Sequence, residues 1–153
     1  MLGVGDLLES AFANTTFNDG SGANMKLIGT GGHSTFNVGS SPNESIVSLG
    51  GYNIINVSGG SGNKITIQET GTDSIDLRDI AFAKNTHVQF KEAADNLSGT
   101  LTVRDGKNEV DLTLLGQYST ANFTLASDGY GGTLITDPQT TASTPGLNLA
   151  AHA

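Results

Sequence analysis

The chain has 153 residues, with 21 Gly and neither Cys nor Trp. Its 15 acidic and 7 basic side chains give a formal net charge of −8, which repels nucleic-acid phosphates and anionic membrane surfaces. The lack of Cys excludes disulfides, thiolate zinc sites and thiol nucleophiles, while the high Gly content favours short strands joined by tight turns.

The chain begins with a pattern that predicts a short helix over residues 5–14. Asp6 is a suitable N-cap, and Glu9 follows it at the spacing of a capping box. On a helix, the apolar residues of this segment would share one face: Leu7, Leu8, Ala11 and Phe12. We therefore expect residues 1–15 to form an N-terminal capping helix that covers the first coil of the β-structure after it.

Residues 16–83 carry a repeat that predicts an all-β fold, a parallel β-solenoid of the β-roll or β-helix type. Short, mostly apolar–polar–apolar triplets recur about every ten residues, so two of them make a coil of about twenty. They are Lys26-Leu27-Ile28, Phe36-Asn37-Val38, Val47-Ser48-Leu49, Ile55-Asn56-Val57, Ile65-Thr66-Ile67 and Ile75-Asp76-Leu77. The alternative is an ordinary β-sandwich whose turns fall at a similar spacing.

Side chains alternate between the two faces of a strand, so the triplets also predict which residues point inward. We expect the outer two residues of each triplet to face the core and the middle one to face solvent. The expected outward rows consist of Asn37, Ser48, Asn56, Thr66 and Asp76.

A different pattern over residues 84–138 predicts a cap of two β-hairpins. The first would pair residues 99–103 with 110–114 around a turn that contains Asp-Gly, a strong short-range hairpin signal. The second would pair 123–125 with 133–135 around a glycine-rich turn. Residues 139–153, rich in Thr, Ala, Ser, Pro and Gly, are expected to form a flexible tail or linker.

Three strings resemble a C-terminal β-rich module of large bacterial repeat proteins of the hemolysin-type or cadherin-like class, which are exported by type I secretion. They are DSIDLRDIAF (73–82), SGTLTVRDG (98–106) and LLGQYSTANFTLASDGYGGTLITDP (114–138). The resemblance is close over residues 70–138, whereas the coil region shares only the general character of such proteins. It implies a secreted or cell-surface location and a β-roll that commonly binds calcium, but no single activity, because such modules occur in adhesins and hydrolases alike.

The sequence departs from the calcium pattern of that family. The closest local match, GGSGNKITI (59–67), has Lys64 where the calcium-binding repeat has an Asp, which argues against a regular calcium ladder. The best isolated metal candidates are Asp73, Asp76 and Asp79, because calcium requires several hard oxygen ligands at once. The alternative is that Asp76 is a plain outward strand residue and Asp79 a turn former.

A ligand site is predicted from the exposed aromatic residues. Carbohydrate-binding modules offer aromatic platforms with polar rims, and without Trp the candidates here are Tyr130 with Asp128 in the glycine-rich turn, and Tyr52. Tyr118 is expected in the core beside Phe123. The alternative is that Tyr52 only edges a coil and Asp128 only shapes a turn.

Together these observations predict a non-catalytic extracellular structural or accessory module of a large secreted bacterial protein. It would act as a rigid spacer and folding cap, with calcium as a candidate stabiliser. The alternative is a carbohydrate-binding module that targets an extracellular polysaccharide.

His33, His87 and His152 are scattered without a nucleophile motif, so we expect no enzyme activity. We expect neither membrane insertion nor a cleavable signal peptide, because no apolar run is long enough and the first basic residue is Lys26.

Overall fold

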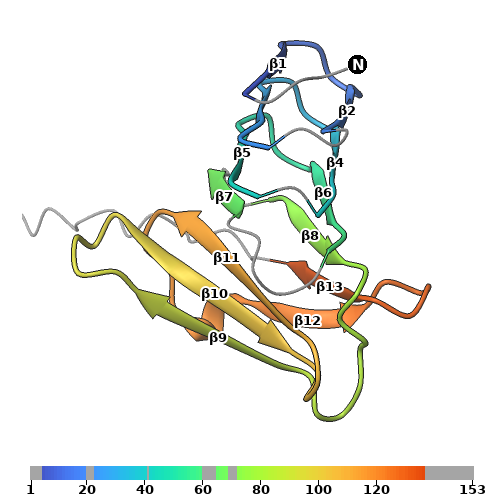
Figure 1. Cartoon of the computed structure of the whole chain (residues 1–153), viewed down its shortest axis with the longest axis vertical. Coiled ribbons are helices and arrows are strands. Elements are labelled where there is room, and N and C mark those ends of the chain that lie inside the picture. The colour runs from blue at the N-terminus through green and yellow to red at the C-terminus, as the bar shows by residue number, and fades with distance from the viewer. Residues whose placement is uncertain (1–4, 20–22, 41, 60–64, 69–71, 137–153) are drawn as a thin grey trace, which may run out of the picture.

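The computed structural model describes residues 5–19, 23–40, 42–59, 65–68 and 72–136, which form an all-β molecule. A parallel β-solenoid of about three turns forms a narrow column, and broader antiparallel strands lie across its lower end (Figure 1). The solenoid strands are β1 (Leu7–Ser10), β2 (Thr16–Asn18), β3 (Lys26–Gly29), β4 (Thr35–Val38), β5 (Glu44–Ser48), β6 (Ile54–Val57), β7 (Ile65–Gln68) and β8 (Ser74–Leu77).

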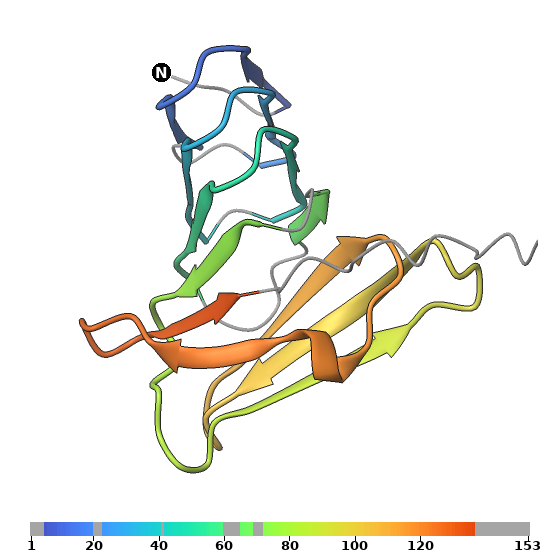
Figure 2. The ribbon, with the colours of Figure 1, turned by 180° about the vertical axis from the view of Figure 1, so that it is seen from behind.

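The solenoid has two sheets, and each coil contributes one strand to each of them. The odd-numbered strands pair in parallel in the order β1-β3-β5-β7, and the even-numbered strands in the order β8-β6-β4-β2. The expected organisation of two triplets to a coil is therefore confirmed. Figure 2 shows the same stack of coils from behind.

Equivalent residues of successive coils form continuous apolar columns inside the solenoid. On one sheet Leu8, Leu27, Ile46 and Ile67 are in register. On the other, Phe17, Phe36, Ile55 and Ile75 are in register, and the rings of Phe17 and Phe36 stack with centroids 4.6 Å apart. Burial of these apolar columns is the main force that holds coil to coil.

The expected alternation of faces is right on the β4, β6 and β8 strands, although Asn56 on the outer face of β6 is only 8% exposed, and it is wrong on β3 and β5. There Leu27 and Ser48 are buried, whereas Leu49 is 41% exposed. The pattern is shifted by one residue because the small residues Gly29 and Ser48 occupy core positions, the first against the rings of Phe17 and Phe36 and the second hydrogen-bonded to Asp73 and Asn53. A Cβ on Gly29 would lie 2.7 Å from Cζ of Phe36, so the aromatic side chains fill the space that a larger residue would need.

The expected N-terminal capping helix is wrong, since residues 7–10 form strand β1. This strand pairs in parallel with β3 in the register Leu8 to Leu27, and Leu8 packs against the core. A short isolated helix is marginal in water, whereas a strand here satisfies its backbone by pairing with the next coil. Phe12, expected on the apolar face of the helix, is instead strongly exposed.

The coils turn at residues that adopt the left-handed backbone conformation. Asn14, His33 and Tyr52 have φ values of 58°, 58° and 56°, and they occupy equivalent corners of three coils. Asn24 and Asn43 form a second such pair, with φ values of 60° and 61°. Asn tolerates this region well, whereas a tyrosine there is unusual and is held by the stacking of the coils.

Both predicted hairpins are confirmed, within a larger antiparallel unit. Strands β10 (Ser98–Arg104) and β11 (Glu109–Leu115) form the first hairpin, and the unpredicted β9 (His87–Glu92) pairs with the other edge of β10. Strands β12 (Thr124–Ser127) and β13 (Thr133–Thr136) form the second, preceded by the short 3₁₀ helix η1 (Thr120–Asn122).

The hairpin strands continue the solenoid sheets and share its core. Strand β11 pairs in parallel with β7, and β13 pairs antiparallel with β8. Buried residues from both parts, from Phe17 through Ile75 to Leu112 and Ile135, belong to one hydrophobic cluster. The part of the chain that the structure describes holds no helix long and apolar enough to cross a membrane. The expected flexible tail, residues 139–153, lies outside the described residues.

Candidate functional site

The structure does not bring the three predicted calcium ligands together. Asp73 is 2% exposed and faces the interior, where Oδ2 accepts a hydrogen bond from Ser48 Oγ at 2.5 Å. Its Oδ1 accepts the backbone N–H of Asn53 at 2.9 Å. Asp73 thus satisfies buried polar groups of the preceding coil, which is a structural role.

The other two predicted ligands have separate surroundings. Asp79 follows β8 on an exposed corner, and its Oδ2 accepts the backbone N–H of Gly59 at 2.6 Å. Asp76 lies on the outward face of β8, opposite to Asp73. Among the described residues, no group of three His, Cys, Asp or Glu side chains could hold a metal ion, and calcium binding stays a prediction.

A buried acidic pair that the sequence patterns did not indicate lies inside the upper coils. Glu44 is only 1% exposed, and neither carboxyl oxygen has a hydrogen bond of good geometry to the described residues. Burial, and secondly the charge of Asp19, raise the pKa of Glu44 to about 7, against a smaller opposing effect of the Met25 backbone. The pKa of Asp19 is also raised, mainly by burial. The interior therefore holds carboxyl groups that resist ionisation.

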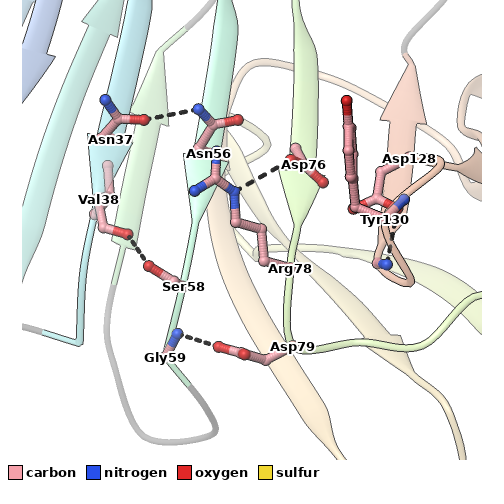
Figure 3. A network of polar contacts seen from close by, with 11 residues as sticks. Asn37, Val38, Asn56, Ser58, Gly59, Asp76, Arg78, Asp79, Asp128 and Tyr130 are labelled. Atoms are coloured by element: carbon pink, nitrogen blue, oxygen red, sulfur yellow. Dashed lines mark hydrogen bonds and ion pairs between the residues drawn. The ribbon is translucent and has the colours of Figure 1, made fainter.

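The outer face of the β2-β4-β6-β8 sheet carries a row of amide side chains. Asn18, Asn37, Asn56 and Asp76 are in register, one from each coil. Asn37 Nδ2 donates to Asn18 Oδ1 at 2.8 Å, and Asn56 Nδ2 donates to Asn37 Oδ1 at 2.7 Å. This asparagine ladder runs along the column and ends at the carboxylate of Asp76, where the hairpin begins (Figure 3).

At that end of the ladder the turn between β12 and β13 borders a groove of about 700 Å³. Its walls combine apolar, amide, charged and aromatic side chains: Thr35, Ile54, Asn56, Asp76, Arg78, Asp128, Tyr130 and Leu134. Figure 3 shows Asp76 and Arg78 of the last coil beside Asp128 and Tyr130 of the hairpin. Two separately predicted candidates, Asp76 and the Tyr130–Asp128 turn, thus belong to one site.

The charges in the groove are unevenly paired. Arg78 Nε lies 3.4 Å from Asp76 Oδ2, and the Asp76 carboxyl group, whose Oδ1 is buried, also interacts with the Asp128 carboxyl group. Burial raises the pKa of Asp76, the hydrogen bond from Arg78 opposes this, and the nearby Asp128 carboxylate adds to the rise. The pKa of Asp128 is lowered, first by the backbone N–H of Tyr130, which donates to its Oδ1 at 2.7 Å. Asp128 is therefore the ionised member and Asp76 the more readily protonated one.

Tyrosine residues differ sharply in their surroundings. Tyr130 is 97% exposed at the tip of the β12–β13 turn, so its ring is free to contact a ligand. Tyr52, the other predicted ligand residue, lies on a coil corner outside the groove, with its ring stacked on His33 at 5.5 Å. Tyr118 packs against Phe90 and Phe123, as expected for a core residue.

Arg78, Asn56 and Ile54 line the groove but were not expected there. The repeat predicts that Asn56 faces outward, yet nothing in the sequence indicates which face of the solenoid the hairpin borders. That information is contained in the pairing of β13 with β8, which joins residues far apart in the chain.

Comparison with known proteins gives no further guide to this site. No protein-family model matches the chain, and neither the curated proteins nor the solved structures include a significant match to it.

Proposed function

We propose that the chain is a non-catalytic structural module, in which the solenoid acts as a rigid spacer and the hairpins act as its folding cap. The observation that carries this proposal is the continuity of both sheets across the boundary between coils and hairpins. Strand β7 is followed in its sheet by β11, and β8 is followed in the other sheet by β13.

A cap is needed because the last coil of a solenoid otherwise exposes unpaired strand edges and part of its core. Here β11 and β13 occupy the edges of β7 and β8, and Leu112 and Ile135 bury their side chains in the common core. The hairpins are held mainly by contacts close in sequence, which form faster than the coil-to-coil contacts. A preformed cap would therefore offer a template on which the coils stack.

Rigidity is supported by the regularity of the column. Apolar side chains stack inside it, and the Asn18–Asn37–Asn56 ladder links successive coils on its outer face. Lateral displacement of one coil would break interior contacts and ladder hydrogen bonds together. A spacer benefits from this coupling because its length is then fixed.

Export and the absence of catalysis belong to the same proposal and rest on sequence. Export to the cell surface or the medium rests on the resemblance of residues 70–138 to type I-secreted modules. The non-catalytic assignment rests on the lack of any motif that pairs a nucleophile with a base. Incubation with polysaccharide substrates should give no hydrolysis product, and reproducible turnover would overturn this part.

The cap role is tested by a substitution that destabilises the hairpins, with hydrogen exchange measured in the coils. Leu112→Ala removes a fully buried side chain of β11, which we expect to cost about 2–5 kcal/mol. Native-state hydrogen exchange should then accelerate in β3 to β6 as well as in the hairpins. Leu115→Ala is the matched control, since Leu115 lies on the same strand and is partly exposed. Unchanged exchange in the coils of Leu112→Ala would show that they fold without the cap.

A further inference from the structure

We infer that the groove lined by Asn56, Asp76, Asp128 and Tyr130 binds a neutral oligosaccharide chain, a function beyond that of spacer and cap. The inference rests on three features of the groove, namely its exposed aromatic ring, its two neighbouring carboxyl groups and its partly balanced charge.

The first feature is the exposed ring of Tyr130. An aromatic residue this exposed at a loop tip gains nothing for the fold, because it buries no surface there. The backbone beneath it is fixed, since Asp128 Oδ1 accepts the N–H groups of Tyr130 and Gly132 at 2.7 and 2.8 Å. The turn that carries the ring is thus fixed at the edge of the groove, where the ring can pack against the apolar face of a sugar.

The second feature is the set of hydrogen-bonding groups below the ring. Asp76 Oδ1 is buried, and the Asp76 side chain interacts with the neighbouring Asp128 carboxylate. Two neighbouring carboxyl groups can accept hydrogen bonds from adjacent hydroxyl groups of one sugar ring. The side chain of Asn56 adds an amide to the same wall, and Ile54 adds an apolar contact.

The third feature is the charge, which favours a neutral sugar over a charged ligand. Two carboxyl groups face one guanidinium, that of Arg78, so the groove repels acidic polysaccharides. The ion pair of Arg78 with Asp76 leaves less negative charge for a cation or a basic peptide than two free carboxylates would. The ligand chemistry that remains is a chain rich in hydroxyl groups and free of charge.

The direction of the asparagine ladder suggests how such a chain lies. Asn56 lines the groove and Asn37 follows it along the column, with one amide for each coil. Coils repeat about every 4.8 Å, so a chain that leaves the groove along this face meets a new amide at each step. We therefore expect longer oligosaccharides to bind more tightly than disaccharides of the same sugar.

The test is calorimetric titration of the full chain with cellohexaose, mannohexaose and xylohexaose, with hexagalacturonate as the acidic counterpart and hexalysine as the cationic one. At least one neutral hexasaccharide should bind, and Tyr130→Ala should weaken it by about tenfold or more. Tyr52→Ala, which removes an exposed tyrosine outside the groove, should leave the affinity unchanged.

A second variant separates the carboxyl group from the aromatic ring. Asp76→Asn removes the charge while placing a fourth asparagine in register with the ladder, so the fold should be retained. It should also weaken binding about tenfold, whereas Asp111→Asn on the exposed face of β11 should not. The inference is overturned if no neutral hexasaccharide binds, if affinity survives Tyr130→Ala or Asp76→Asn, or if hexagalacturonate or hexalysine is the preferred ligand.

Discussion

Replacement of the buried Glu44 by glutamine should make the protein more stable at alkaline pH. The pKa of Glu44 rises from 4.5 to about 7 on folding, and one pKa unit corresponds to about 1.4 kcal/mol. The raised pKa therefore costs the folded state about 3 kcal/mol once both states are ionised. Because the folded-state pKa is the higher one, the stability that protonated Glu44 contributes is fully present below pH 4.5 and is lost as the pH rises through 7.

A glutamine at this position keeps the size of the side chain but cannot ionise, so only the wild type should lose this stability. The free energy of unfolding can be measured by urea denaturation at pH 4 and pH 8. The value for Glu44→Gln minus that for the wild type should be about 3 kcal/mol larger at pH 8 than at pH 4. Near neutral pH this corresponds to a melting temperature about 6–12 °C higher. The exposed Glu92→Gln serves as the control. A difference between Glu44→Gln and wild type that is the same at both pH values would refute the reasoning.

Two further substitutions test the polar contacts between coils. Asp73→Ala leaves the buried donors of Ser48 and Asn53 without an acceptor, so thermal melts should show a loss of about 2–4 kcal/mol. The loss should be equal in calcium and in EDTA; a loss confined to calcium buffer would instead assign Asp73 to a metal site. Asn37→Ala interrupts the asparagine ladder at two hydrogen bonds and should cost about 1–2 kcal/mol in denaturant titrations, more than Thr35→Ala on the same strand. Equal effects of these two variants would mean that the ladder contributes nothing.

The sequence was sufficient to predict the coils where the core positions are large and apolar. Phe36, Val38, Ile55 and Val57 mark their strands clearly, because apolar residues alternate with an outward Asn. The opposite sheet was misread because its core includes a polar residue, Ser48, while Leu49 is left outside. Such a position is decided by the volume and polarity of the groups that lie across the core, which a local pattern does not contain.

The N-terminal strand was mistaken for a helix for a related reason. The local capping signals of Asp6 and Glu9 are compatible with a helix, but the edge of β3 offers backbone pairing that outweighs them. The hairpins were predicted well because turn and strands lie together in sequence.

Individual residues of the groove could be predicted from the sequence, but their assembly into one site could not. Asp76 and Asp128 were each singled out, but their approach depends on β13 pairing with β8. Glu44 was missed altogether, because an acidic side chain at an inward position gives no signal until the core around it is known.

The near-identical geometry of successive turns has a practical consequence for engineering. The steps from Phe17 to Phe36 to Ile55, from Asn14 to His33 to Tyr52, and from Asn24 to Asn43 all equal nineteen residues. Duplicating residues 25–43, which repeats the buried Met25 and leaves Glu44 single, would therefore insert one whole layer whose partners above and below are already of the right kind, and would lengthen the molecule by about 4.8 Å. The chain thus contains the unit from which rods of chosen length could be made.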